Sequence, residues 1–255
     1  MKFITAQHTD IGIKKKTNQD SLLIEQAHTK KGDVLLAVIC DGLGGLAKGE
    51  AASACAAKAF SEWFRNEFPD ILYSGMSPEA LCDSWENLAK ELNMRIIEYG
   101  NNCHLELGTT CVALLIVENT YYIMNIGDSR AYLISDNVYQ LTKDQTWVQN
   151  EIDAGRLTEE EALVSPQRSV LLQCIGVNGD VFPDFFTGEV KKDQCFMLCC
   201  DGFRHVITLD EFYNYLGAFA NKDENAMKDN LVYLTELNKQ RNETDNITAI
   251  LVKTI

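Results

Sequence analysis

The sequence has no stretch approaching the roughly 20 apolar residues that a membrane-spanning helix needs. Its first residues, Met1 to His8, turn polar too early for a secretion signal. It also lacks an excess of positive charge, because 23 Lys and Arg face 37 Asp and Glu, a formal net charge of -14. Nucleic-acid backbones and anionic membrane surfaces would be repelled by such a protein. We therefore expect a cytoplasmic protein with neither nucleic acid nor a membrane as a partner.

Cysteine and histidine patterns that bind zinc are missing as well. The chain has no Cys-x-x-Cys pair, and several of its nine cysteines lie in apolar runs, where reduced cysteine acts as a small hydrophobe. The run Gly42-Leu43-Gly44-Gly45 lacks the Lys-Ser/Thr ending of a nucleotide-binding loop. The four histidines show no ligand spacing: His8, His28, His104 and His205. Only His205, which follows Asp201 closely, stays an open question.

What the chain does contain is a set of short, apolar, strand-like segments separated by helical patterns. The predicted strands lie near residues 3–6, 21–26, 34–40, 111–117, 121–126, 130–135, 195–200 and 247–253. The predicted helices cover residues 49–68, 77–99, 209–219 and 224–240. This order favours an α+β fold in which two mainly antiparallel sheets pack face to face with helix pairs outside. The polar segment 144–170 is expected to be a short helical excursion on the surface.

Aspartates recur where apolar runs end. Three runs each end beside an aspartate and a glycine: Leu35 to Cys40 before Asp41-Gly42, Tyr121 to Ile126 before Gly127-Asp128, and Phe196 to Cys200 before Asp201-Gly202. Asp20 and Asp245 stand just before further apolar runs, so antiparallel strands could bring all five aspartates to one edge. Five clustered carboxylates would repel one another unless cations lay among them.

An oxygen-only site rich in aspartate selects hard divalent cations such as Mg²⁺ or Mn²⁺. One carboxylate can bridge two such ions, which together activate a water for phosphoryl chemistry. Asp41 is our candidate for the bridging ligand, because the glycines after it let backbone carbonyls approach a cation. The run Lys14-Lys15-Lys16 lies shortly before Asp20 and could supply a phosphate anchor.

Five motifs in order resemble the metal-dependent serine/threonine protein phosphatases of type 2C, in their compact bacterial form. The motifs are Gly12 with Lys15 and Asn18-Gln19-Asp20, then Asp41-Gly42-Leu43-Gly44-Gly45 with Gly49-Glu50 and Ala52-Ser53, then Gly108-Thr109-Thr110, then Asn125 to Arg130, and finally Asp201-Gly202 with Asp245-Asn246. The resemblance spans essentially the whole chain. It implies one catalytic domain over residues 1–255, built as a four-layer αββα sandwich, with a flap subdomain at about 144–170.

The resemblance also implies roles for single residues. Asp41 would bridge two core ions, the Gly42 carbonyl would join one of them, and Asp201 and Asp245 would hold the other. Asp20 would belong to the same cluster and act through bound water. A third, weaker ion would lie between Asp128 and Asp201, and Lys15 would bind the phosphate.

Three positions depart from the family pattern. Lys15 replaces an arginine, so the charge stays but the bidentate fork is lost. Gln19 replaces a glutamate, which removes a negative charge beside Asp20. Leu43 and Leu46 stand where some members carry a histidine, so the general acid is left open.

The leading hypothesis is hydrolysis of phosphoserine and phosphothreonine on proteins by a metal-activated water, without a covalent enzyme intermediate. The expected partners are phosphorylated proteins, a serine/threonine kinase among them, and the expected state is a monomer. Two alternatives remain: a non-catalytic phosphoprotein-binding module on the same fold, and a metal-dependent hydrolase of small phosphate esters. A binding module would be expected to lose metal ligands, whereas this chain retains Asp20, Asp41, Asp128, Asp201 and Asp245.

Overall fold

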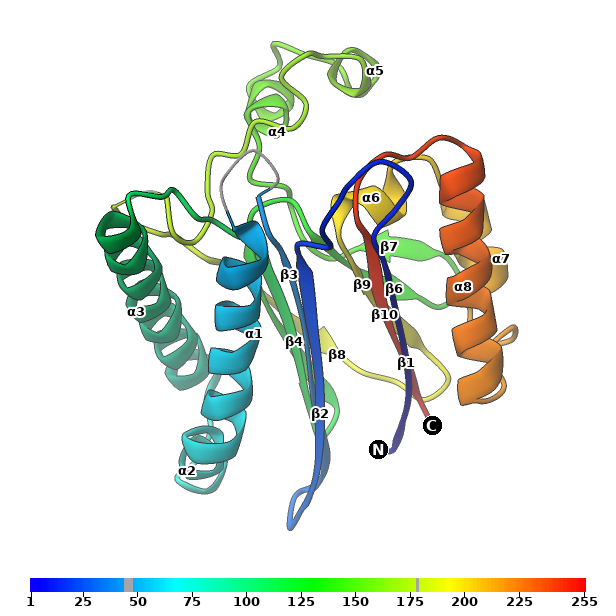
Figure 1. Ribbon diagram of the computed structural model, residues 1–255. Helices are drawn as coiled ribbons and strands as arrows, with labels where there is room; N and C mark the ends of the chain where they lie inside the picture. Colours follow the sequence, from blue (N-terminus) through cyan, green and yellow to red (C-terminus); the bar gives the residue numbers. More distant parts are fainter. Residues whose placement is uncertain (44–47, 178) are drawn as a thin grey trace.

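Two five-stranded sheets pack face to face, and helices cover the outer face of each (Figure 1). The computed structural model describes residues 1–43, 48–177 and 179–255. This arrangement confirms the predicted α+β sandwich of four layers. Three residues of the glycine-rich motif, Gly44, Gly45 and Leu46, lie outside the described residues.

Both sheets are antiparallel between all the strands that the structure describes. The first sheet has the order β1 (Phe3–Asp10), β10 (Ile247–Thr254), β9 (Cys195–Cys199), β6 (Arg130–Ile134) and β7 (Val138–Gln140). The second has the order β2 (Asp20–Thr29), β3 (Gly32–Asp41), β4 (Cys111–Val117), β5 (Thr120–Ile126) and β8 (Asp184–Glu189). The chain therefore crosses between the sheets several times, which brings residues distant in sequence together at the sheet ends.

The helices form two groups outside the sandwich (Figure 1). Beside the second sheet lie α1 (Gly49–Asn66), α2 (Phe68–Tyr73) and α3 (Pro78–Cys103), and beside the first lie α7 (Leu209–Leu216) and α8 (Glu224–Gln240). The short α6 (Asp201–Arg204) follows β9 directly, while α4 (Trp147–Asp153) and α5 (Glu159–Leu163) project from one end. None of the helices in the described ranges is long and apolar enough to cross a membrane.

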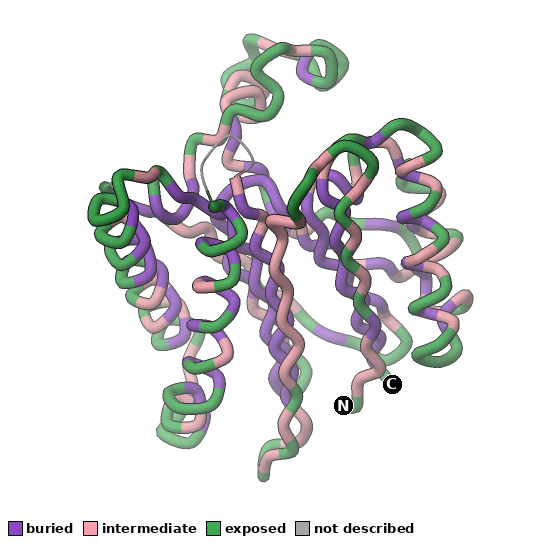
Figure 2. The backbone as a smooth tube through the Cα atoms, in the orientation of Figure 1, coloured by how far each residue is buried: buried purple, intermediate pink, exposed green. Residues whose placement is uncertain are grey.

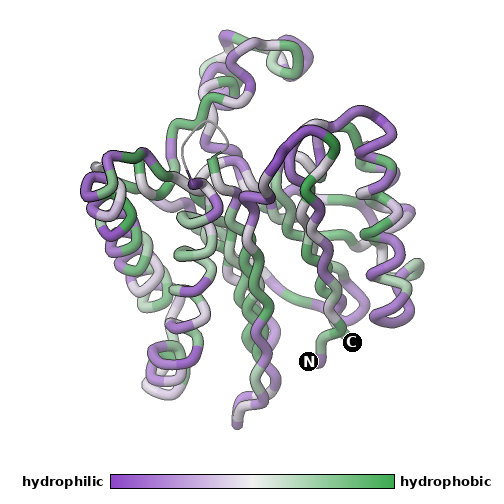
Figure 3. Tube along the Cα trace, in the orientation of Figure 1, coloured by the Kyte–Doolittle hydropathy of each residue, from purple (hydrophilic) through white to green (hydrophobic). Residues whose placement is uncertain are grey.

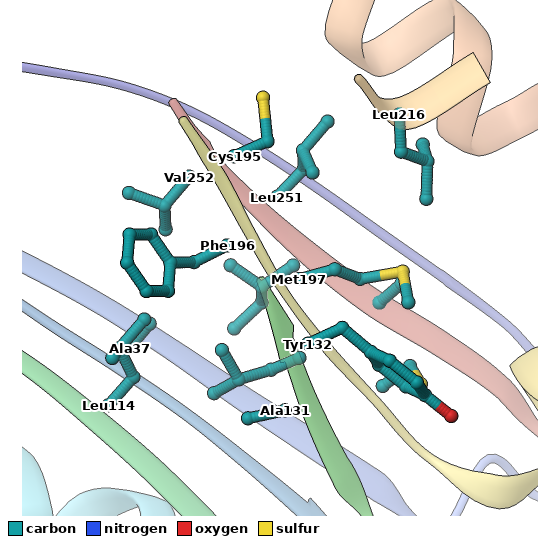
Figure 4. Packing of buried hydrophobic residues seen from close by; sticks show 14 of the residues in the cluster. Ala37, Leu114, Ala131, Tyr132, Cys195, Phe196, Met197, Leu216, Leu251 and Val252 are labelled. Carbon is teal, nitrogen blue, oxygen red and sulfur yellow. The ribbon is translucent and has the colours of Figure 1, made fainter. Parts of the chain in front are cut away.

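The central strands are buried on both faces, which explains why they are almost entirely apolar (Figures 2 and 3). Along β3, Leu35 and Ile39 belong to the cluster between the sheets, whereas Leu36 and Val38 pack toward α1 and α3. This alternation follows from the two-residue period of a strand. Figure 4 shows Phe196 of β9 pointing toward the opposite sheet.

Two of the described strands, β7 and β8, and two short helices, α2 and α6, were not predicted. The strand β7 has only three residues, and β8 (Asp184–Glu189) is an edge strand that includes acidic residues and Gly188, which have low strand propensity. The helix expected over 49–68 ends at Asn66, and α2 starts at Phe68 with a proline in its first turn. The helix α7 ends at Leu216 because Gly217 turns to an extended conformation.

Candidate active site

The five predicted aspartates converge at the end of the sandwich from which α4 and α5 project (Figure 1). Asp20 and Asp41 lie directly opposite each other at the ends of β2 and β3. Asp201 begins α6 after β9, Asp245 shortly precedes β10, and Asp128 lies in the connection between the two sheets. All four neighbours act electrostatically on Asp41. The structure therefore brings together every acidic residue that the strand pattern placed at one edge.

Burial and mutual repulsion make this cluster unfavourable as a set of bare anions. Burial raises the pKa of Asp41 well above its ordinary value, and repulsion from Asp20 and Asp201 raises it further. The same causes raise the pKa of Asp20 to about 6 and that of Asp128 to about 7. Cations placed among these carboxylates would lower the pKa of each and remove the repulsion.

The donor atoms fit hard divalent cations. Both carboxylate oxygens of Asp20 and Oδ1 of Asp201 are buried and accept no hydrogen bond from the described residues. Asp20, Asp41 and Cys200 each offer one ligand atom, and these atoms lie within 4.8 Å of one another. Buried carboxylate oxygens without donors are costly, and a cation satisfies them. The oxygen-rich set suits Mg²⁺ or Mn²⁺.

Asp41 is held in place by the two threonines of the Gly108-Thr109-Thr110 motif. Its backbone N–H donates to Thr110 Oγ1 at 3.1 Å, and its carbonyl accepts from Thr109 Oγ1 at 3.0 Å and from the Thr110 N–H at 2.8 Å. Thr110 Oγ1 also lies 2.8 Å from Ser129 Oγ, beside Asp128. The motif therefore fixes two of the acidic positions relative to each other.

Gly42 allows three backbone segments to meet beside Asp20 and Asp41. Its N–H donates to the Gln19 carbonyl at 3.1 Å. A Cβ added at this position would lie 2.4 Å from the Gly49 carbonyl oxygen and 2.6 Å from that of Gln19. Alanine therefore cannot replace Gly42 without moving the end of β3 or the start of α1. The predicted role of the Gly42 carbonyl as a metal ligand remains a prediction.

Lys15 lies at the edge of the acidic cluster. Its Nζ is 2.6 Å from Asp245 Oδ1. Burial lowers the pKa of Lys15, but the hydrogen bond and charge of Asp245, together with the charges of Asp41 and Asp201, raise it further than burial lowers it, so the side chain stays charged. Asn246 holds the loop that carries Lys15, because its Nδ2 donates to the carbonyls of Ile11 and Thr17 at 3.0 and 3.2 Å. Its Oδ1 accepts from the Gln19 N–H at 2.9 Å. The structure therefore places a cation next to the predicted ligands.

Sequence reasoning missed a buried charged network beside Asp128. Arg130 donates from Nε and Nη2 to the two carboxylate oxygens of Asp144, at 2.7 Å each. Arg204 Nη2 donates to the Asp128 carbonyl at 3.0 Å and to Asp144 Oδ2 at 3.3 Å. The sequence offered one indication of this network: a basic residue, Arg204, stands three positions after the predicted metal ligand Asp201, within the same helical turn.

His205 belongs to the rim of this site, which answers the question left open by its closeness to Asp201. Its Nε2 lies 3.5 Å from Asp201 Oδ2, and its Nδ1 lies 3.2 Å from Glu243 Oε2. Glu243 Oε1 accepts from the N–H of Thr244 at 2.7 Å and from that of Asp245 at 2.9 Å. His205 and Glu243 thus connect two predicted metal ligands.

The segment 144–170 contains α4 and α5 and projects beyond the sandwich (Figures 1 and 2). At its base, the Gln145 N–H donates to the Gly127 carbonyl and the Gly127 N–H donates to Gln145 Oε1, both at 2.9 Å. Because Gly127 precedes Asp128, the base of the segment is tied to the acidic cluster. The segment exposes Leu163 and Val164.

A sandwich whose two sheets deliver five aspartates and a lysine to one end has the donor set of a metal-dependent phosphatase. The family model described as Protein phosphatase 2C matches residues 12–246. The chain therefore belongs to the protein phosphatase 2C family, as its motifs predicted.

Individual relatives are similar over nearly the whole chain. The serine/threonine phosphatase stp of Listeria innocua is 29% identical over 250 residues, covering 96% of this chain and 93% of its own. The structure of the Streptococcus agalactiae serine/threonine phosphatase has a TM-score of 0.84 at 28% identity, with full coverage of both chains. The catalytic domain of the phosphatase PstP, in complex with two manganese ions, has a TM-score of 0.79 at 27% identity, covering 99% of this chain and 98% of its own.

Proposed function

We propose that the protein hydrolyses phosphoserine and phosphothreonine on phosphorylated proteins, with Mn²⁺ or Mg²⁺ as the cofactor. Family membership makes it a type 2C protein phosphatase, a metal-dependent hydrolase. The observation that carries the proposal for this chain is the convergence of five aspartates beside the charged Lys15. Two of them, Asp20 and Asp201, have buried carboxylate oxygens that accept no hydrogen bond from the described residues. This arrangement favours an active enzyme over a binding module that has lost its ligands.

Asp20, Asp41, Asp201, Asp245 and the Gly42 carbonyl would hold two ions, with Asp41 as the shared ligand. When bound, such ions lower the pKa of a water and offset the charge of the reacting phosphoryl group. The threonines beside Asp41 hold its backbone N–H and carbonyl, which fixes the point from which the carboxylate extends and reduces the reorganisation needed during the reaction. The side chains of the site orient the reactants, and we assign no covalent nucleophile among them.

Lys15 would bind phosphoryl oxygens while remaining next to Asp245. An ammonium group has three donors, so one can stay with Asp245 and the others can face the substrate. Compared with an arginine, it holds the phosphate as a point charge without a bidentate geometry. We expect the phosphate to be oriented less strictly as a result.

We further propose that residues 1–255 form one catalytic domain and that the segment 144–170 acts as a flap at its active site. The exposed Leu163 and Val164 support contact between this flap and a phosphorylated protein. A serine/threonine kinase would be a functional partner, because this protein would remove the phosphate groups that the kinase adds. The protein would act as a cytoplasmic monomer. The predicted third ion would lie between Asp128 and Asp201, a position that Arg204 makes less favourable.

The test is release of phosphate from a phosphothreonine peptide in Mn²⁺, with a chelated sample as the reference. The Asp201→Asn protein should lose the metal-dependent release while remaining folded. Asp229→Asn, at an exposed position of α8, is the matched control and should keep full activity. Undiminished release by Asp201→Asn, or release that survives chelation, would contradict the proposal.

A further inference from the structure

Asp128 has a guanidinium group beside it. Arg204 Nη2 lies 3.8 Å from Asp128 Oδ2 and donates to the Asp128 carbonyl at 3.0 Å. Both side chains are largely buried, with 10% of the Asp128 side chain and 12% of the Arg204 side chain exposed. The carboxylate thus has a cation next to it that belongs to the chain and cannot lose its proton.

Arg204 is held in this position by a second anion. Its Nη2 also donates to Asp144 Oδ2 at 3.3 Å, and Asp144 is itself fixed by the two bonds from Arg130. Arg130 in turn donates from Nη1 to the Tyr132 hydroxyl at 3.0 Å. Displacing Arg204 would leave Asp144 short of a partner in a buried place, which is costly.

Asp201, the other residue expected to hold a third ion, also has a basic side chain beside it. The Nε2 atom of His205 lies 3.5 Å from Asp201 Oδ2. Both basic residues come from α6 and the residue after it, so the turn that begins with Asp201 places Arg204 toward Asp128 and His205 toward Asp201 itself. A divalent ion between the two aspartates would lie among these groups.

We propose that Arg204 takes the place of a third cation beside Asp128, and that the protein therefore binds two divalent ions. The inference rests on the proposed function, because it concerns the same metal site. Asp128 then acts as a positioning residue: it holds Arg204, and through Asp144 it is connected to the base of the segment 144–170. A third ion would meet the repulsion of the guanidinium, while the charge of Asp128 is already offset.

The experiment counts bound manganese in the wild-type protein and in three variants. Bound Mn²⁺ is counted by titration calorimetry and by electron paramagnetic resonance of the free ion, carried to saturation. The wild-type protein should bind two ions, and Asp128→Asn should also bind two, with only a small change in affinity because Asp128 acts on Asp41 through its charge. Arg204→Met should gain a third, weaker site, because the fixed charge is gone and Asp128 becomes available. Arg204→Lys keeps a positive charge at this position and should return the count to two.

Circular dichroism and the unfolding transition of each variant establish that it is folded. If Arg204→Met does not fold, the comparison of wild type with Asp128→Asn still decides the matter. Three ions in the wild type and two in Asp128→Asn would overturn the inference, because Asp128 would then be a ligand. A third site that is absent from a folded Arg204→Met protein would overturn it as well.

The same samples separate this inference from the proposed function. A wild-type protein that releases phosphate and binds three ions contradicts the role of Arg204 alone. A wild-type protein that binds no manganese and releases no phosphate contradicts the proposed function and the inference with it.

Discussion

Lys15 Nζ and Asp245 Oδ1 lie 2.6 Å apart, so the predicted phosphate anchor is ion-paired with a predicted metal ligand. The pair joins the loop after β1 to the segment just before β10, so it links two regions near opposite ends of the chain. Asn246 reinforces the connection by bonding to the same loop. The phosphate-binding and metal-binding parts of the site are therefore positioned by common contacts.

Replacing Lys15 with methionine should lower kcat/KM for a phosphopeptide by about tenfold, because one charge-assisted hydrogen bond to the phosphate is lost. Most of the loss should appear in KM. The matched control is Lys14→Met, since Lys14 is exposed and belongs to the same lysine run. Steady-state kinetics of both variants provide the measurement, and equal effects in the two would argue against a specific role for Lys15.

The sequence pattern was sufficient for the sandwich and the acidic cluster because both follow from local rules. Strands such as β3 and β4 are buried on both faces and are recognised by continuous apolar runs. Their ends, where Asp20 and Asp41 are paired, follow from antiparallel order. The pairing of Arg204 with Asp144 could not be predicted, because it joins residues 60 positions apart through tertiary packing.

Replacing Asp41 with asparagine should lower phosphate release more than about 100-fold, as expected for loss of a ligand shared by both ions. The same variant should unfold at a higher temperature than the wild type in the presence of a chelator, because repulsion with Asp20 and Asp201 is reduced. Added Mn²⁺ should reverse this order. Differential scanning calorimetry with and without metal checks the stability, and a variant that Mn²⁺ stabilises as much as the wild type would contradict the shared-ligand role.

The chelated protein should lose stability as the pH rises from about 4 to about 7. Burial and repulsion from Asp201 raise the pKa of Asp20 to about 6 and that of Asp128 to about 7, from the ordinary aspartate value of 3.8. Over this window the folded state binds more protons than the unfolded state, so its stability falls with rising pH. Urea unfolding in a chelator, measured from pH 4 to pH 8, provides the test. Saturating Mn²⁺ should weaken this trend, and chelated protein whose stability increases steadily over the window would contradict the proposed electrostatics.

Thiol labelling should distinguish Cys103 from the buried cysteines. All nine cysteines are free, Cys103 is exposed, and Cys55 and Cys82 are partly exposed. Burial raises the pKa of Cys174 to about 11, so at neutral pH this cysteine stays a protonated thiol, which reacts poorly. A maleimide reagent followed by peptide mass spectrometry should modify Cys103 first and the six buried cysteines only after unfolding. Rapid labelling of Cys174 in the folded protein would contradict this order.

Replacing Asp144 with asparagine should destabilise the protein by about 3 to 5 kcal/mol, because Arg130 would lose its anionic partner and Arg204 one of its two, in a buried place. The matched control is Asp153→Asn, whose ion pair with Lys143 is largely exposed and should contribute no more than about 1 kcal/mol. Urea denaturation gives the free energy of unfolding of both variants. If the two variants lose similar amounts, the buried network does not hold the base of the segment 144–170 in the way that its geometry indicates.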